Sequence, residues 1–145
     1  MDIIQLSRDD LHRVQPLWEE LNALHGLRST HFKAHFESFT FERRIAKLLD
    51  KAHLAVFAAQ ADTEIVGYCL TTADDECGEL DSLYMQKAYR GIGLGTRLSD
   101  QALAWLHSLG CTDIRVAVAE GNEAAIPFYE KLGFQKRFTV LKLKE

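Results

Sequence analysis

The stretch "LDSLYMQKAYRGIGLGTRL", residues 80–98, constrains the fold more than any other part of the chain. Its first six residues are typical of a strand, and from Leu94 onward apolar residues recur at the three- to four-residue spacing of an amphipathic helix. Between these two elements Gly91, Gly93 and Gly95 leave the chain bare of side chains. Glycines ahead of a helix let backbone N–H groups approach an anion closely, and the helix dipole favours negative charge there. The pattern therefore predicts a strand, an anion-binding loop and a helix.

Two common phosphate-binding motifs do not match this loop. A P-loop requires a lysine directly after its last glycine, and none follows Gly95. A dinucleotide fingerprint, GxGxxG, fails whether it is started at Gly91 or at Gly93. The remaining possibility is a loop that binds a pyrophosphate, whose negative charge Arg90 or Arg97 is able to pair with. A glycine-rich turn required only by chain geometry is the alternative.

The rest of the chain divides into further elements on both sides of this stretch. Ser7 and Asp10 form a capping-box pattern that predicts the start of a helix, and Gly26 is placed to end it. Gly110 and Gly133 are placed to end two later helices. The predicted elements are strand 2–6, helix 8–25, a helical region over 31–50, a β-hairpin of 53–60 and 64–72, strand 79–85, helix 94–109, strand 113–119, helix 122–132 and a last strand over 136–144.

This order predicts an α/β fold with a mixed sheet, in a single domain of residues 1–145. The sheet is expected to be mostly antiparallel, with about four helices around it. One crossover makes strands 79–85 and 113–119 a parallel pair. A chain of 145 residues can bury a true core without metal or disulfide staples.

Composition narrows the classes of function. A net charge of −4 argues against a general nucleic-acid binder, and no run approaches the roughly 18 apolar residues of a membrane span. The first twenty residues carry charge throughout and show no apolar signal core. Cys69, Cys77 and Cys111 are odd in number and far apart, which argues against a disulfide framework or a CxxC metal site. We therefore expect a cytoplasmic protein with reduced thiols.

Two linked motifs, within about residues 78–135, strongly resemble the GNAT acetyltransferase superfamily. "RGIGLG" (90–95) matches the acetyl-CoA loop of that family, Q/R-x-x-G-x-G/A. "NEAAIPFYEKLGF" (122–134) matches its downstream pattern of Asn, Ala, an aromatic pair, Lys and Gly-Phe. The resemblance implies the GNAT fold, in which the strand before the loop has a bulge and splays from the next parallel strand.

The resemblance also implies a binding site for acetyl-CoA. Main-chain groups at the end of the splayed strand would bind the pantetheine arm and the thioester carbonyl. Loop N–H groups would cradle the pyrophosphate, and the asparagine of the second motif would reach the pantetheine. The coenzyme-binding residues implied are Leu83, Tyr84 and Met85 on the strand, Arg90, Gly91, Ile92, Gly93, Leu94, Gly95 and Thr96 on the loop, and Asn122, Ala125, Phe128 and Lys131 beyond it.

The activity implied is acetyl transfer to a primary amine of a small molecule or peptide, by direct attack in a ternary complex. Tyr129 matches the family's tyrosine, and a neutral phenol can donate a proton to the departing thiolate; a packing role is the alternative. Glu79 and Asp81 point to one face of a strand and are the candidates for the base. The acidic stretch 74–81 around them has two interpretations. Its charges would raise the pKa of a carboxyl group and attract a cationic amine, or the stretch is simply a solvated turn. The main-chain N–H of Met85 is the candidate oxyanion donor.

Other readings stay open. A catalytically silent, acyl-CoA-binding regulatory module would keep the loop and tolerate loss of Tyr129. His31 and His35 have no obvious third ligand, so no metal is expected. The segment "HGLRSTHF" (25–32) is placed to wall the acceptor site in this fold, but the acceptor itself is not predicted. A sheet that ends in one exposed strand near the carboxyl terminus predicts a homodimer paired there.

Overall fold

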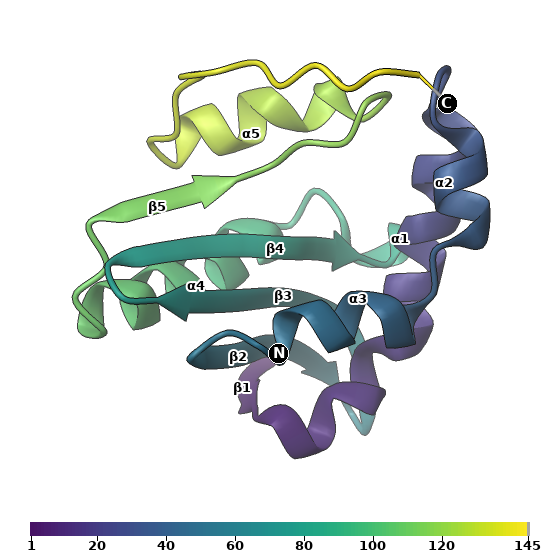
Figure 1. Ribbon diagram of the computed structural model, residues 1–145. Helices are drawn as coiled ribbons and strands as arrows, with labels where there is room; N and C mark the ends of the chain where they lie inside the picture. The colour runs from purple at the N-terminus through teal and green to yellow at the C-terminus, as the bar shows by residue number, and fades with distance from the viewer. Residues whose placement is uncertain (145) are drawn as a thin grey trace.

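The computed structural model describes residues 1–144, which form a five-stranded sheet in the order β1-β2-β3-β4-β5. Neighbouring strands run antiparallel except for β4 and β5, which are parallel, as predicted (Figure 1). The strands are β1 (Asp2–Leu6), β2 (His53–Ala61), β3 (Glu64–Asp74), β4 (Cys77–Met85) and β5 (Asp113–Val116).

Helices cover both faces of the sheet. The segments η1, α1 and α3 pack on one face and α4 on the other, while α5 lies beyond β5 (Figure 1). The α-helices are α1 (Gln15–Arg28), α2 (Lys33–Ser38), α3 (Phe41–Leu48), α4 (Leu94–Ser108) and α5 (Ile126–Lys131), and the 3₁₀ helices are η1 (Arg8–Val14), η2 (Lys87–Tyr89) and η3 (Glu123–Ala125).

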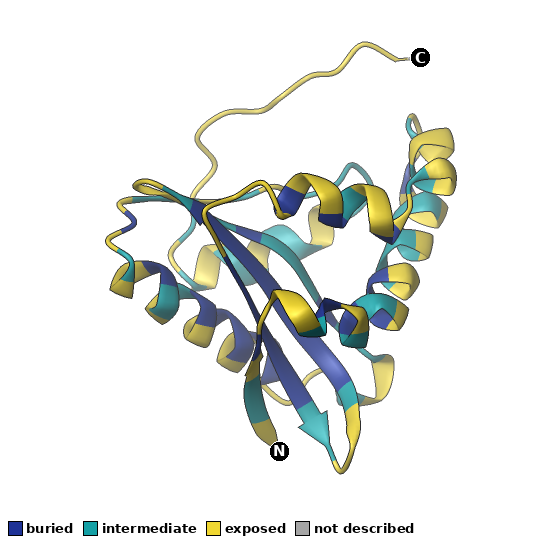
Figure 2. Ribbon diagram, turned by 60° about the horizontal axis from the view of Figure 1, so that its bottom comes forward, coloured by how far each residue is buried: buried dark blue, intermediate teal, exposed yellow. Residues whose placement is uncertain are grey.

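Alternation along the central strands builds two apolar cores. On β2, Val56 packs toward α1 and Phe57 packs toward α4, and both are buried. Figure 2 shows this burial concentrated in the middle of the sheet, with exposed residues on the outer sides of the helices. Each fully buried large apolar side chain contributes roughly 1.5–3 kcal/mol relative to exposure, so the paired cores are what hold the layers together.

The parallel pair is short and then splays. β5 pairs with β4 only between Cys77 and Leu80, and beyond that point the β5 side of β4 has no strand partner. The β3–β4 register skips Asp81, because Leu70 faces Ser82 while Thr71 faces Leu80. This is a β-bulge, which bends a strand and increases its local twist. The bulge and the splay are both confirmed.

The amino-terminal helices differ from their predicted bounds. Ser7 makes no side-chain cap, and the chain first forms the 3₁₀ helix η1. Pro16 lies in the first turn of α1, where its missing N–H costs nothing. Gly26 does not end the helix, which continues to Arg28. The region 31–50 is divided into α2 and α3, so the structure has five α-helices where about four were predicted.

The carboxyl-terminal region departs more strongly. The strand predicted over 113–119 ends at Val116, and the last strand, predicted over 136–144, is wrong. Figure 2 shows this terminal segment leaving the body of the molecule, so it meets no strand edge to pair with. Four apolar side chains on it are 78% to 91% exposed: Phe138, Val140, Leu141 and Leu143.

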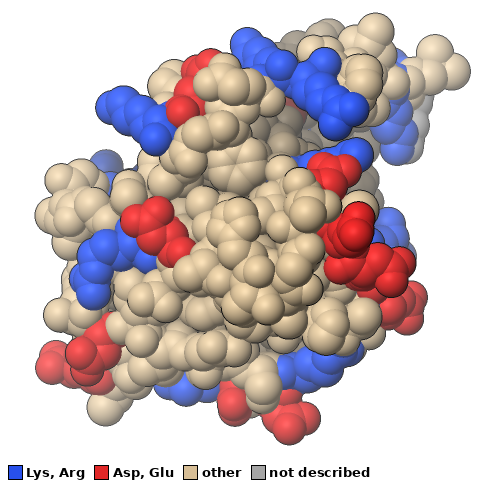
Figure 3. All heavy atoms as spheres, turned by 90° about the vertical axis from the view of Figure 1, so that its left-hand side faces the viewer, with Lys and Arg blue, Asp and Glu red and all other residues tan. Residues whose placement is uncertain are grey.

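Charges are spread over the surface. On the face seen in Figure 3, Lys and Arg residues alternate with Asp and Glu around the rim, and uncharged residues fill the centre. That mixed pattern accords with the small net charge of −4. Within residues 1–144, none of the helices has the length and apolar character needed to span a membrane. The cytoplasmic location stays a prediction.

Candidate active site

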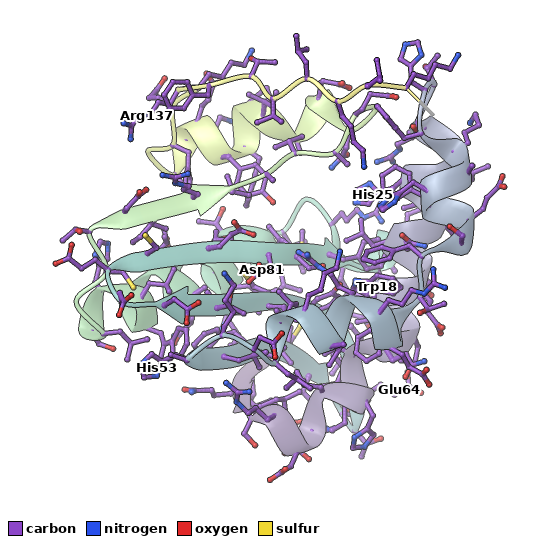
Figure 4. The ribbon with its side chains drawn as sticks, viewed as in Figure 1. Trp18, His25, His53, Glu64, Asp81 and Arg137 are labelled. Atoms are coloured by element: carbon purple, nitrogen blue, oxygen red, sulfur yellow. The ribbon has the colours of Figure 1, made fainter. Side chains whose placement is uncertain are left out.

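A cavity of about 350 Å³ lies where β4 and β5 part. Its walls are α1 and α2 on one side, and on the other the middle of β4, the residues that follow β5, and Tyr129. In Figure 4, Trp18 and His25 lie on the α1 side of this space and Asp81 on the β4 side. A wider and shallower hollow of about 650 Å³ between β1 and α4 contains only Arg97 among the candidate site residues.

The cavity brings together five residues that the sequence predicted for the site. Glu79, Asp81 and Leu83 come from β4, while Asn122 and Tyr129 come from the segment after β5. The splay is what makes this possible, because it opens a space between two strands that are hydrogen-bonded at their other end.

Asp81 is the most perturbed carboxyl in the cavity. Its side chain is 2% exposed and lies 3.7 Å from the Arg44 guanidinium. Thr72 donates a hydrogen bond to it (2.6 Å). Burial raises the pKa of Asp81 to about 7, helped by the neighbouring Glu79 and opposed by Thr72 and Arg44. A carboxyl that titrates near neutrality is suited to accept a proton at physiological pH.

Tyr129 meets the requirement for an acid. Its ring packs edge-on against Phe128 (5.2 Å between centroids) and Phe134 (6.0 Å). Burial raises the pKa of Tyr129 to about 12, so the phenol keeps its proton at neutral pH. Because the residue both packs and lines the cavity, the packing and proton-donor interpretations are compatible.

The main chain at the end of β4 points into the splay. The Gln86 N–H donates to the Val66 carbonyl, which makes these two a hydrogen-bonded antiparallel pair. The preceding pair, Met85 with Gly67, is then non-hydrogen-bonded, so the N–H and carbonyl of Met85 point away from β3. Leu83 has the same orientation two residues earlier. These are the groups that the sequence assigned to the pantetheine arm.

The glycine loop presents open main chain beside this strand end. Gly91 (φ +78°) and Gly93 (φ +79°) adopt left-handed conformations, and a Cβ on either would meet no atom within 4 Å. In the described chain, no turn or cap hydrogen bond is donated by the N–H groups of residues 91–96. Successive free N–H groups at a helix start form an anion-binding concavity, so this loop fits a pyrophosphate.

Arg90 and Gly95, at the two ends of the glycine loop, lie close to the end of β4. Arg90 donates to the Met85 carbonyl (2.8 Å) and lies over the Tyr84 ring (5.3 Å). A Cβ on Gly95 would lie 2.8 Å from Met85 Cε and 3.4 Å from Phe128, so glycine lets α4 start against both side chains. Phe128 therefore joins α5 to the loop.

Three further residues of the predicted loop and motif do not line the cavity. Arg97 donates to the Met1 carbonyl (3.2 Å), which holds its guanidinium on the β1 side of the helix. Ala125 lies in η3 and Lys131 at the end of α5, and neither is among the described residues that line the cavity.

The sequence did not predict the hydrogen bonds that join Glu120 to residues 29–31, which we call the bridge. The Glu120 carboxylate accepts hydrogen bonds from the N–H groups of Thr30 and His31 (both 2.8 Å) and from the Ser29 hydroxyl (3.1 Å). These hydrogen bonds lower the pKa of Glu120. Contacts between residues about ninety positions apart leave no signal in a single sequence.

Two neighbours of Glu120 extend this bridge. Gly121 (φ +93°) packs so closely on the Arg28 carbonyl that any Cβ there would collide with it. The Asn122 side chain, at the start of the helix predicted over 122–132, makes no cap hydrogen bond and accepts a hydrogen bond from Arg28 instead (3.1 Å). The loop after β5 is thus fastened to the end of α1.

The histidines predicted not to bind metal have other contacts. His35 packs against the rings of Phe36 and Phe39, while the N–H of His31 bonds to Glu120. Within residues 1–144, no group of three His, Cys, Asp or Glu residues is arranged to hold a metal ion.

Comparison with known proteins finds a single family over most of the chain. The sequence model of the acetyltransferase (GNAT) family matches residues 18–134. An uncharacterized N-acetyltransferase of Mycobacterium tuberculosis is 34% identical over 93 residues, which are 63% of this chain and 60% of that protein. The chain thus aligns with less than two thirds of that relative's length. An acetyltransferase of Yersinia pestis is 26% identical over 141 residues, 97% of this chain and 92% of the relative.

Solved structures share the fold. A putative acetyl transferase from Pyrococcus furiosus has a TM-score of 0.78 at 19% identity, covering 99% of this chain and all of the other. Aminoglycoside N-acetyltransferase AAC(6')-Iy in complex with CoA has a TM-score of 0.70 at 20% identity, covering 99% of this chain and 98% of that one. At these identities the likeness establishes the architecture.

Proposed function

The chain belongs to the acetyltransferase (GNAT) family, and we propose that it transfers an acetyl group from acetyl-CoA to a primary amine. The observation that carries the proposal is the splay of β4 from β5. Main-chain groups of β4 that have no strand partner, a buried carboxyl and a protonated phenol lie along this splay, next to a loop suited to a diphosphate, and together they support the proposal.

Several residues would hold the coenzyme. The N–H groups of residues 91–96 would bind its pyrophosphate, and the main chain of Leu83 and Met85 would bind the pantetheine arm. Asn122, held by Arg28, would approach the same arm from the other wall. Tyr84, Ala125, Phe128 and Lys131 stay in this proposal as flanking positions implied by the family motif.

The chemistry assigns a task to each cavity residue. When bound, acetyl-CoA supplies a thioester; the amine nitrogen bonds to its carbonyl carbon and the carbon–sulfur bond breaks. Asp81, or Glu79 beside it, takes the proton that the amine must lose. Tyr129 donates its proton toward the leaving sulfur and regains one from solvent. The Met85 N–H stabilises the negative charge that develops on the carbonyl oxygen.

The test is release of CoA by the purified full-length chain across a panel of amines, with thermal unfolding in parallel. An enzyme is expected to release CoA with at least one amine. An increase in melting temperature with acetyl-CoA, without release for any amine, would favour the alternative of a silent acyl-CoA-binding regulatory module. No increase and no release would exclude both.

The homodimer expected from the sequence also stays a proposal. It is supported by two unsatisfied features of each copy: the open edge of β5 and the exposed apolar segment 136–144. Two copies related by a twofold axis would present each feature to the other.

A further inference from the structure

One end of the cavity carries a net negative charge that a single cation would neutralise. Glu79 and Asp81 line it together with a single guanidinium, that of Arg44. When both carboxyls are ionised, two negative charges and one positive charge leave a net charge of about −1 at this end of the cavity. One ammonium group neutralises it.

The opposite wall is aromatic. The rings of His35 and Phe39 are stacked (centroids 5.0 Å apart, planes at 30°), and Trp18 meets Phe39 edge-on at 5.8 Å. Lys47, an exposed residue that does not line the cavity, lies over the same Phe39 ring, 5.9 Å from its centroid. Such a wall suits a flat ring.

One polar atom in the wall has no partner. The Nδ1 atom of His25 is buried and unbonded, one of three such side-chain atoms in the described chain. The other two, on Thr71 and Ser99, do not belong to the cavity lining. Burial lowers the pKa of His25, and the charge of Arg28 lowers it further, so the imidazole stays neutral. A buried polar atom without a partner is costly. Because Nδ1 has almost no exposed surface, a ligand group reaches it and recovers that cost only when the His25 side chain turns toward the cavity.

The bridge limits the size of what can enter. Because Glu120 ties residues 29–31 to the loop after β5, the two walls of the cavity cannot separate freely. The volume of about 350 Å³ is at the small end of the roughly 300–1,000 Å³ found for small-molecule sites, and in the proposed function the acceptor shares it with the thioester end of acetyl-CoA.

From this geometry we infer that the cavity is the acceptor site, and that the acceptor is a compact primary amine on an aromatic ring with one further hydrogen-bonding group. This inference rests on the proposed acetyltransferase function. The ammonium lies by Glu79 and Asp81, the ring lies on the wall formed by His35 and Phe39, and the further group bonds to His25. Polyamines, aminoglycosides and peptides are disfavoured by their extra charges or their length.

The first test ranks acceptors with the unmodified full-length chain. The measurement is kcat/KM from CoA release for tyramine, 2-phenylethylamine, spermidine, neamine and an alanine tripeptide. Tyramine is expected to exceed spermidine, neamine and the tripeptide by roughly tenfold or more. If one of those three is preferred, the inferred class is wrong while acetyl transfer stands. If no amine releases CoA although acetyl-CoA raises the melting temperature, the proposed function itself fails, and this inference with it.

The second test isolates His25. His25→Phe keeps a ring but removes the nitrogen, so the tyramine-to-phenylethylamine ratio of kcat/KM should fall roughly three- to tenfold. His53→Phe, the same change at an exposed position on β2 away from the cavity (Figure 4), should leave the ratio unchanged. An unchanged ratio in His25→Phe, or an equal fall in His53→Phe, would overturn the role of His25. If His25→Phe does not fold, the acceptor ranking of the unmodified chain decides.

Discussion

Asp81 is the residue at which backbone irregularity, burial and charge coincide. Asp81 is the extra residue of the bulge and has no direct partner on β3. Its side chain bonds to that of Thr72, and the next residue, Ser82, bonds to the side chain of Tyr68, so both point to the same side of the sheet. Consecutive residues of a regular strand face opposite ways. The bulge thus places a carboxyl in the cavity without moving the rest of β4.

Asp81 should give the enzyme a pH dependence near neutrality. The base must be ionised, so kcat/KM is expected to rise as pH passes through about 7, the raised pKa of Asp81. Asp81→Asn should remove this rise, and Glu79→Gln should keep it but shift it to lower pH, because Glu79 helps to raise the pKa of Asp81; both are measured in pH profiles of CoA release. The opposite pattern would make Glu79 the base.

The same group predicts the sign of a stability change. Its pKa is about 7 in the folded chain and near 3.8 in the unfolded one, so the folded state holds a proton that the unfolded chain loses between these values. The stability that Asp81 contributes is therefore present below about pH 4 and lost as pH rises through 7. Urea unfolding of Asp81→Asn should show a smaller fall in stability over this range than the unmodified chain. An identical fall would mean that the carboxyl is not perturbed.

Tyr129→Phe tests the acid while keeping the packing against Phe128 and Phe134. Turnover should fall by roughly 10²-fold or more, the usual loss for a general acid, with CoA affinity nearly unchanged. Tyr89→Phe in η2, outside the cavity lining, is the matched control. Equal turnover in the two variants would remove Tyr129 as the proton donor.

At the scale of elements, the start of α4 can be compared with its end. Gly93 (φ +79°) and Gly110 (φ +83°) have nearly the same backbone conformation, and a Cβ on either would meet no atom within 4 Å. An alanine at either position should cost roughly 1–2 kcal/mol through left-handed strain. Only Gly93→Ala adds a methyl group to the proposed diphosphate site.

We therefore expect Gly93→Ala to weaken CoA binding and Gly110→Ala to leave it unchanged, in calorimetric titrations at equal fractions of folded protein. A bulkier Gly93→Val should abolish binding. If both alanine variants bind CoA like the unmodified chain, the loop is a turn required by geometry alone.

The bridge between elements is testable without any substrate. Glu120→Gln keeps the shape of the side chain but removes its negative charge and one acceptor oxygen, which weakens its hold on Thr30 and His31. Amide hydrogen exchange at residues 29–31 should become faster. Glu130→Gln, an exposed change on α5, is the control. Unchanged exchange in Glu120→Gln would show that the walls are held by other contacts.

At the scale of the whole molecule, the apolar tail is the least satisfied part of the fold. Sedimentation of the unmodified chain at micromolar concentration should show a dimer. The double variant Leu141→Asp, Leu143→Asp should be a monomer, because it would bury two charges in the proposed contact. Lys142→Asp, on the same segment, is the matched control. A monomeric unmodified chain would refute the pairing.

Local signals explain why so much of the architecture was predictable. The three glycines and the motif over 122–134 are short-range features that carry the family resemblance, and that resemblance implied the bulge and the splay. Apolar spacing and turn residues along the chain predicted the order of elements, apart from the last strand, and with it the parallel pair. Two apolar runs on either side of a polar turn predicted the hairpin of 53–60 and 64–72. Such patterns are read from neighbours in the chain, where spacing alone dictates which side chains share a face.

Long-range packing determined the features that the sequence did not predict. Gly26 lies inside α1 despite its low helix propensity, at a point where a Cβ would lie 3.5 Å from Cβ of Phe36 on α2. Residues 136–144 have the composition of a strand but reach no free edge, and a strand exists only through pairing. The Glu120 bridge depends on segments about ninety residues apart meeting in space. Local chemistry in the chain thus sufficed for the coenzyme loop, whereas the shape and polarity of the acceptor cavity arise only when distant segments pack together.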